Sequence, residues 1–391
     1  MATARLSDFP AAPPTGVPAV RRAWWGQPAG YAAFAVFAAV TVAVTHLEPH
    51  RVWGRAAVIA YGLAACATLL WRSRHRDTIA AMAVGGAVLF PLAVLVAAGQ
   101  GQPEVAVVQR SGEHLLAHGT PYLGPDDLAG VADYRAYNPY LPGMALFGVP
   151  WAVAGIDARL VFAAVFLAAM GAAARSLHGR ALPDASLLLF ASPLVALPLV
   201  VGGDDLPVIG LACLGLTWAA QGRPGAAGLV LGCAAVLKAT AWPVLAVAFV
   251  LVLARGGARR FAGFAGAVTA AGIVPVLLAD PGGFTENVVR FPLGLAGVES
   301  PADSPMPGRL LAESGTYGHV AALALLVLAA LAVAVSLLVR PPRDLRSAAL
   351  RLALGLLLAA ALMPATRWGY LVYPAVLACW AHFGGRTWRA A

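Results

Sequence analysis

The sequence predicts an all-α protein that crosses a membrane many times. Three observations support this prediction: 60% of the 391 residues are hydrophobic, only 12% are charged, and the mean hydropathy is +0.77. A soluble domain usually carries about twice this charged fraction. Apolar stretches of bilayer length recur from residue 30 to residue 383, and short breaks that contain arginine separate them. This composition excludes an ordinary soluble fold.

The apolar stretches predict a bundle of about 12 transmembrane helices, within a range of about 11 to 13. The predicted spans are residues 30–46, 55–71, 78–99, 158–174, 185–201, 205–220, 224–238, 241–254, 261–279, 319–339, 347–363 and 368–383. The 42 glycines and 29 prolines suit closely packed and interrupted membrane helices. Residues 1–29 are expected to form a flexible cytoplasmic tail, and residues 30–391 a single transmembrane domain.

The distribution of arginine predicts the orientation in the membrane. Twelve spans place both termini on one side, together with the arginine-rich breaks at 72–76, 255–260 and 340–346, whereas most acidic residues lie on the other side. Cytoplasmic loops carry an excess of positive charge, so the termini are predicted to be cytoplasmic in a multi-pass protein of the plasma membrane. The net charge of +9 follows this distribution and indicates no nucleic-acid partner.

This topology requires that the apolar stretch 141–156 does not cross the membrane. Pro142, Gly143, Gly148 and Pro150 interrupt it, which favours a re-entrant or surface helix. The alternative is a true span, with the count corrected elsewhere. Two long outer loops result, at residues 100–157 and 280–318, and both are rich in aromatic, acidic and proline residues. Loops of this length are usually functional, so the working face is predicted to be external.

The two short spans within 224–254 predict a lysine at membrane depth. About 31 residues at about 1.5 Å each give roughly 46 Å for two passes of a hydrocarbon core about 30 Å thick. The tip, which contains Lys238 and Trp242, is therefore expected beneath a cavity that opens to the outer face. A lysine at that depth needs a counter-charge or water, unless its side chain extends to the interface, which is the alternative.

Acidic residues of the outer face are candidate catalytic groups. Glu104 follows the third span, and Asp204 and Asp205 open a later span after two glycines. Helix capping is an alternative role for Glu104 and explains one carboxylate of the aspartate pair, but it does not explain both equally well. The other acidic pair, Asp126 and Asp127, is expected in a solvated turn.

Basic residues on this face are few, and they suit a phosphate. Arginine binds phosphate with a planar fork and lysine binds it as a point charge. The candidates are Lys238, Arg290, Arg367 and Arg135, although each arginine taken singly also fits an ordinary interfacial role. No glycine-rich nucleotide-binding motif accompanies them. Neither the four cysteines nor the outer acids show the spacing of metal ligands, so no metal site is expected.

Five segments stand in a characteristic order along the outer face. They are Glu104 with the helix that ends in Leu115-Leu116-Ala117-His118-Gly119-Thr120-Pro121-Tyr122, Tyr137-Asn138-Pro139-Tyr140-Leu141-Pro142, Gly203-Asp204-Asp205-Leu206-Pro207, Lys238-Ala239-Thr240-Ala241-Trp242-Pro243, and Pro364-Ala365-Thr366-Arg367-Trp368-Gly369-Tyr370. Over residues 95–383, this order resembles glycosyltransferase family 87 and its actinobacterial relatives, within the GT-C superfamily. There are two departures. The family's leading acid is usually Asp, where this chain has Glu104, and the polar turn often carries Gln or Asn, where this chain has Asp204 and Asp205.

The resemblance implies a GT-C-like bundle that transfers a hexose, typically mannose, from a polyprenyl-phosphate sugar to a lipid or glycan acceptor of the cell envelope. It implies no cofactor beyond this membrane-borne donor and no metal. One of Glu104, Asp204 and Asp205 would be the general base of an inverting transfer, with Glu104 ranked first. The other implied contacts are Lys238, Arg290, Arg367 and Arg135 for the phosphate, and Tyr122, Tyr137, Asn138, Trp242 and Trp368 for the sugar cleft.

Two other functions remain open at this point. A secondary transporter would also have twelve spans, both ends inside and a charge at depth. The absence of a repeat between 30–200 and 205–383, and the long loops on one side, speak against it. The second is a catalytically silent relative that binds a lipid-linked sugar, which the two departures from the family pattern motivate.

Overall fold

A computed structural model describes residues 28–71, 75–179 and 189–384. The tail predicted for residues 1–29 lies almost entirely outside the described residues. Helices and connecting turns make up the described part, whose only β-type pairing is an isolated bridge between Asp303 and Thr366. The prediction of an all-α fold is therefore confirmed for these residues.

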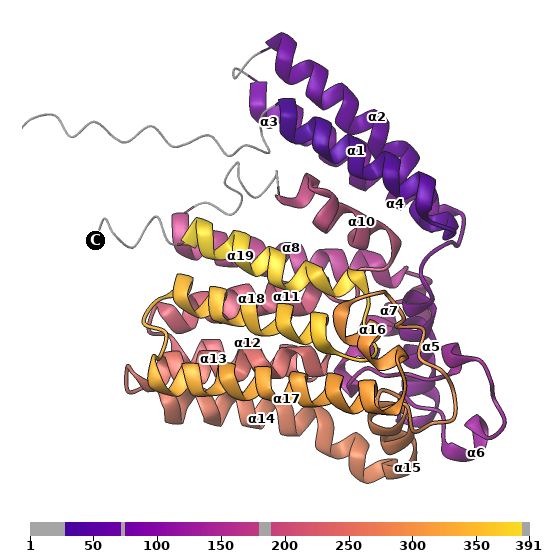
Figure 1. Ribbon diagram of the computed structural model, residues 1–391, viewed down its shortest axis with the longest axis vertical. Helices are drawn as coiled ribbons and strands as arrows, with labels where there is room; N and C mark the ends of the chain where they lie inside the picture. Colours follow the sequence, from indigo (N-terminus) through magenta and orange to yellow (C-terminus); the bar gives the residue numbers. More distant parts are fainter. Residues whose placement is uncertain (1–27, 72–74, 180–188, 385–391) are drawn as a thin grey trace, which may run out of the picture.

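The N-terminal helices form a group of their own beside the main bundle (Figure 1). They are α1 (Pro28–Val44), α2 (Glu48–Trp71), α3 (Arg76–Val84), the π-helix η3 (Gly85–Leu89) and α4 (Phe90–Ala97). Helix α10 (Pro193–Val201) lies between this group and the rest of the molecule and contacts both α2 and α8. The predicted span 185–201 lies partly outside the described residues, and α10 falls in its described part.

The remaining long helices form the main bundle. They are α8 (Ala158–His178), α11 (Leu206–Ala220), α12 (Pro224–Ala235), α13 (Trp242–Leu253), α14 (Ala258–Ala279), α17 (Thr316–Val339), α18 (Leu345–Leu362) and α19 (Val372–Gly384). Helix α11 is central: almost all of its residues are buried, and it packs against α8, α12, α13, α18 and α19. A helix surrounded by other helices can be apolar on every face, as α11 is.

Six helices of the described part are long and apolar enough to cross a membrane: α2, the continuous run Arg76–Ala97, α8, α14, α17 and α18. Only 11% of the apolar window is buried in α14 and in α17, so their leucine, valine and phenylalanine side chains face outward. Such faces would be unfavourable in water and are suited to lipid. The molecule is therefore a membrane protein, while a count of twelve crossings stays a prediction, because α1, α11, α12 and α13 are shorter.

The two long loops gather at one end of the bundle, which we call the loop end (Figure 1). The first, residues 100–157, contains α5 (Pro103–His118), α6 (Pro125–Leu128), the 3-10 helices η4 (Tyr134–Ala136) and η5 (Pro142–Phe147), and α7 (Val149–Ala154). The second, residues 280–318, contains α15 (Pro281–Phe284), the π-helix η7 (Thr285–Arg290) and α16 (Pro307–Glu313).

The stretch 141–156 is broken into η5 and α7, which meet at Gly148. A Cβ on Gly148 would overlap the backbone of α5 at Val108, and one on Gly112 would overlap the backbone at Gly148. These two glycines let the broken segment lie directly on α5. Irregular backbone in a membrane protein needs such contact with protein, and the segment is too short to span a core of about 30 Å.

Candidate functional site

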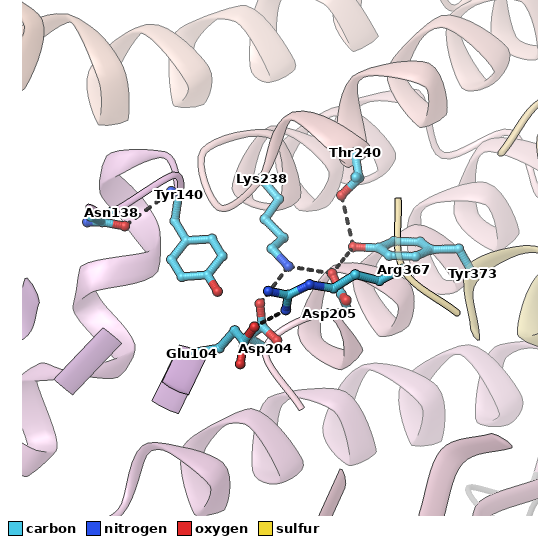
Figure 2. Close-up of polar contacts among 9 residues, drawn as sticks. All are labelled: Glu104, Asn138, Tyr140, Asp204, Asp205, Lys238, Thr240, Arg367 and Tyr373. Carbon is cyan, nitrogen blue, oxygen red and sulfur yellow. Dashed lines mark hydrogen bonds and ion pairs between the residues drawn. The ribbon is translucent and has the colours of Figure 1, made fainter. Parts of the chain in front are cut away.

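Two groups of opposite charges meet at the loop end of α11, α12 and α13 (Figure 2). In the first, Lys238 Nζ lies 2.5 Å from Asp204 Oδ2 and 2.5 Å from Asp205 Oδ1. In the second, the Arg367 guanidinium forms an ion pair with Glu104. We call these five residues the charged cluster. With every group ionised, its three carboxylates and two cations leave a net charge of −1.

The lysine reaches the cluster from the tip between two short helices. Helices α12 and α13 have 12 residues each, or about 18 Å of helix. Between them Lys238 has an extended backbone, which directs its side chain toward the start of α11 rather than along either helix. Its side chain is only 13% exposed and does not extend to the surface. The two carboxylates thus provide the counter-charge that a buried lysine requires.

The aspartate pair enters the cluster from a tight turn before α11. Gly203 has φ +84, a backbone conformation that favours glycine, and it brings two successive carboxylates to the helix start. The Asp205 side chain makes no capping hydrogen bond with α11. It accepts one hydrogen bond from Lys238 and another from the Tyr373 hydroxyl, at 2.7 Å. The Tyr373 hydroxyl also contacts Thr240 Oγ1 at 2.8 Å. Asp205 is therefore held in place by two donors.

Glu104 and Arg367 come from widely separated parts of the sequence. Glu104 lies in the first turn of α5, and its side chain is 16% exposed. Arg367 follows Thr366, whose backbone pairs with the second loop through Thr366 N to Ala302 O at 2.9 Å. Burial alone would lower the pKa of the Arg367 guanidinium, but the Glu104 carboxylate raises that pKa above its ordinary value. Arg367 therefore stays charged, and with 32% exposure it is the more accessible of the two cations.

Tyr140 forms one wall of the cluster. Lys238 Nζ lies 4.9 Å from the centre of the Tyr140 ring, a cation–π contact. Figure 2 shows the Tyr140 hydroxyl directed toward the side of the cluster that holds Glu104 and Asp204. The sequence analysis named the neighbours Tyr137 and Asn138 instead. In the segment Tyr137-Asn138-Pro139-Tyr140, the second tyrosine is therefore the one that contacts the charged cluster.

The predicted site residues Asn138 and Tyr122 hold Tyr140 in place through hydrogen bonds to its backbone. The Asn138 side-chain oxygen accepts a hydrogen bond from the Tyr140 backbone N at 3.1 Å, and the Tyr122 hydroxyl donates to the Tyr140 carbonyl at 2.8 Å. Asn138 N donates to Asn287 Oδ1 of the second loop at 2.8 Å. The two loops thus fix Tyr140 jointly, and the hydrogen bonds of Asn138 and Tyr122 go to residues outside the charged cluster.

Five other predicted residues have their contacts outside the cluster. Tyr137 stacks on Phe291 with ring centres 4.7 Å apart. The ion-pair partners of Arg290 and Arg135 are neighbours within their own loops, Glu286 and Asp133. Trp242 and Trp368 flank the Lys238 and Arg367 segments, and about half of each side chain is exposed. The structure therefore does not bring these five residues into the charged cluster.

Three residues of the site were missed by the sequence analysis: Tyr140, Thr240 and Tyr373. The first two belong to motifs that had been singled out, so the segment was identified without the side chain that faces inward. Tyr373 lies inside the predicted last span, where an aromatic residue is unremarkable.

A buried arginine connects the two segments that carry the acids. Arg159 is 1% exposed and pairs with Asp157 through Nη2 to Oδ2 at 2.7 Å and Nε to Oδ1 at 2.9 Å. Its Nη1 donates to Gln100 O at 2.7 Å and to Val200 O at 3.2 Å. Gln100 precedes Glu104, and Val200 precedes the aspartate pair. Arg159 therefore sets the spacing between the two acid-bearing segments.

Replacement of Arg159 by lysine is expected to loosen this connection, because an ammonium group cannot form the planar fork and donate to both carbonyls. A backbone hydrogen bond from Gln102 N to Val201 O, 2.7 Å long, joins the same two segments, so its stability reports on how firmly they are connected. Hydrogen exchange of the Gln102 amide should become about 5 to 10 times faster. The matched control is Arg351→Lys, which removes a contact between α18 and Ser336 of α17. Unchanged exchange at Gln102 in Arg159→Lys would contradict this role.

The sequence matches a known protein family. The sequence model of glycosyltransferase family 87 matches residues 138–365, more than half of the chain. The chain belongs to glycosyltransferase family 87. As a member of this family it is a membrane glycosyltransferase, which acts with membrane lipids and with sugar donors and acceptors. No curated protein and no solved structure gives a match.

The family match covers part of the charged cluster. It includes Asp204, Asp205 and Lys238, together with Tyr140. Glu104 lies well before the start of the match, and Arg367 lies just after its end. The structure brings these two outlying residues together, beside the residues within the match. The cluster is thus a property of the whole folded chain of this family 87 glycosyltransferase.

Proposed function

We propose that this family 87 glycosyltransferase transfers a hexose, in the first place mannose, from a polyprenyl-phosphate sugar to a lipid or glycan acceptor of the cell envelope. In this proposal it is a GT-C enzyme of the plasma membrane that works on the external face, with cytoplasmic termini and without a metal cofactor. One observation carries the proposal: a carboxylate and an arginine, Glu104 and Arg367, are paired beside a second, lysine-centred group of acids. A base and a phosphate-binding cation are thus adjacent.

The proposed reaction is an inverting displacement at the anomeric carbon. A carboxylate takes the proton from the acceptor hydroxyl, the oxygen forms the new bond to the anomeric carbon, and the bond to the lipid phosphate breaks on the opposite face of the sugar. Glu104 suits the role of base better than either aspartate. Asp205 already accepts from Lys238 and Tyr373, and Asp204 accepts from the same lysine and is 9% exposed, against 16% for Glu104. A general base needs a lone pair within hydrogen-bond reach of the hydroxyl.

The ion pair itself suggests how the base becomes available. Arg367 forms the only ion pair of Glu104 among the described residues. A donor phosphate that binds the Arg367 guanidinium would compete with Glu104 for it, since arginine binds carboxylate and phosphate with the same planar fork. Donor binding would then release Glu104 for the acceptor proton. Arg367 would also offset the charge that builds on the leaving phosphate.

Lys238 has a different part in this proposal. It is shared by Asp204 and Asp205, whose combined charge exceeds its own. We therefore propose that Lys238 positions the aspartate pair and that Arg367 contacts the phosphate directly. The Tyr140 hydroxyl, directed toward Glu104 and Asp204, is suited to bind a sugar hydroxyl.

A second candidate is a catalytically silent member of the family that binds the lipid-linked sugar without transferring it. Two departures from the pattern that the resemblance implies favour it: Glu104 in place of Asp, and Asp204 with Asp205 in place of an amide. An extra methylene moves a carboxylate by about an ångström, which is enough to matter in a preorganised site.

The test uses the purified protein in lipid with radiolabelled polyprenyl-phosphate mannose and total membrane lipid as the acceptor pool. A labelled product of inverted anomeric configuration is expected. Donor that binds and stays intact would overturn the transferase and support the silent relative. No donor binding, with substrate accumulating in sealed vesicles without any sugar donor, would overturn both and favour a transporter.

A further inference from the structure

A cavity lined by arginines lies at the end of the bundle opposite the charged cluster. Its volume is about 450 Å³, and Arg255, Arg259 and Arg260 line it together with Gly222 and Pro224. Among the residues that the structure describes, no acidic residue lines it. The cavity is therefore strongly cationic, and its volume lies in the range of about 300 to 1,000 Å³ that is typical of pockets for small ligands.

The chain itself places the cavity far from the charged cluster. Helix α11 begins after Asp205 and ends at Ala220, beside the cavity. Helix α13 begins four residues after Lys238 and ends at Leu253, again beside the cavity. The 15 residues of α11 correspond to about 22 Å. In Figure 1 these ends lie on the side away from α5 and α7. The cavity and the cluster are separate sites.

Arg255 is fixed in its orientation by backbone carbonyls. Its Nη1 donates to Ala219 O at 3.1 Å and to Ala220 O, and its Nη2 donates to Arg343 O at 2.8 Å. Three of the five N–H groups of a guanidinium are thus occupied. The other two have a fixed direction and are available to an anion, which reduces the entropy that binding costs.

Arg259 and Arg260 are exposed, and neither forms an ion pair within the described part of the chain. Three guanidinium groups around one cavity repel one another unless an anion lies between them. Apolar side chains flank the same end: Leu253 and Phe264 are both about half exposed. An occupant with a phosphate head and an acyl tail would satisfy both the arginines and these apolar neighbours.

We propose that this cavity binds a phosphate-bearing anion, with the head group of an anionic membrane lipid as the occupant. Guanidinium groups match phosphate oxygens with parallel hydrogen bonds. Basic pockets between membrane helices are known as sites for anionic lipid head groups. A soluble phosphate has the same chemistry, so the experiment has to separate the two sources. The proposal does not depend on sugar transfer.

The test measures lipid binding by native mass spectrometry of the full chain, with phosphatidylglycerol as the probe and phosphatidylcholine as the zwitterionic comparison. The variant is Arg259→Gln with Arg260→Gln. The matched control is Arg340→Gln with Arg346→Gln, which removes the same charge from exposed residues outside the cavity. Unchanged unfolding temperatures of both variants establish that they are folded.

Phosphatidylglycerol is expected to bind more tightly than phosphatidylcholine, and the cavity variant should lose about tenfold or more of its affinity while the control keeps its own. Equal losses in both variants would overturn the proposal, because general surface charge would then explain binding. Equal affinity for both lipids would overturn it too. In a separate titration, inorganic phosphate that binds in place of the lipid, and only when Arg259 and Arg260 are present, would retain the anion site but overturn the lipid as its occupant.

Discussion

Replacement of Glu104 by glutamine is expected to reduce the rate of sugar transfer by a factor of about 100 to 10,000, the range that a general base contributes. Glutamine keeps the size and the hydrogen-bonding oxygen of the side chain, but it cannot accept the proton of the acceptor hydroxyl. The measurement is single-turnover transfer from labelled donor at saturation, so that a change in donor affinity does not alter the result.

The control is Glu113→Gln on the same helix. Glu113 is exposed and accepts a hydrogen bond from the Trp151 indole at 3.0 Å, away from the charged cluster. It should transfer sugar at the parental rate. Parental activity in Glu104→Gln would move the base to the aspartate pair, and parental activity in both Glu104→Gln and Asp205→Asn would contradict carboxylate catalysis at this site.

Replacement of Lys238 by methionine is expected to destabilise the protein strongly. It leaves Asp204 and Asp205 buried with no cation, and removal of one partner of a buried ion pair costs about 3 to 5 kcal/mol. Asp204→Asn should be much milder, because Lys238 and Asp205 then form a neutral pair. The measurement is the midpoint temperature of unfolding for each variant in one detergent.

A combined variant separates the charge effect from the loss of packing. Lys238→Met with Asp204→Asn and Asp205→Asn contains no buried charge at this position, so it should unfold at a higher temperature than Lys238→Met alone. If Asp204→Asn is as destabilising as Lys238→Met, the shared lysine is not what holds the aspartate pair.

Much of the fold could be predicted because membrane helices leave a strong signal in the sequence. The predicted span 205–220 corresponds to α11, and the span 261–279 lies within α14. The short length of 224–254 also predicted a deep Lys238 that needs a counter-charge, and Lys238 is paired with two carboxylates. Apolar length does not predict which short helices cross the bilayer, since a buried helix such as α11 has the same composition.

The arrangement of the site was less predictable than its composition. Glu104 and Arg367 were both candidates, but 263 residues separate them, and no local pattern indicates that they pair. For a related reason the sequence did not indicate that Tyr140, rather than Tyr137, contacts Lys238. In an irregular segment no periodicity indicates which side chain faces inward. That direction is decided by distant contacts, such as the hydrogen bond from Asn138 to Asn287.

The central claim is that donor phosphate replaces Glu104 on Arg367, and donor affinity tests it most directly. The measurement compares equilibrium binding of polyprenyl-phosphate mannose to the parental protein, Glu104→Gln and Arg367→Gln in the same lipid. Arg367→Gln should bind about tenfold or more weakly, because the phosphate loses its guanidinium partner. Glu104→Gln should bind as tightly as the parent or more tightly, because the competing carboxylate is gone. Unchanged affinity in Arg367→Gln, or weaker binding in Glu104→Gln than in the parental protein, would contradict the claim.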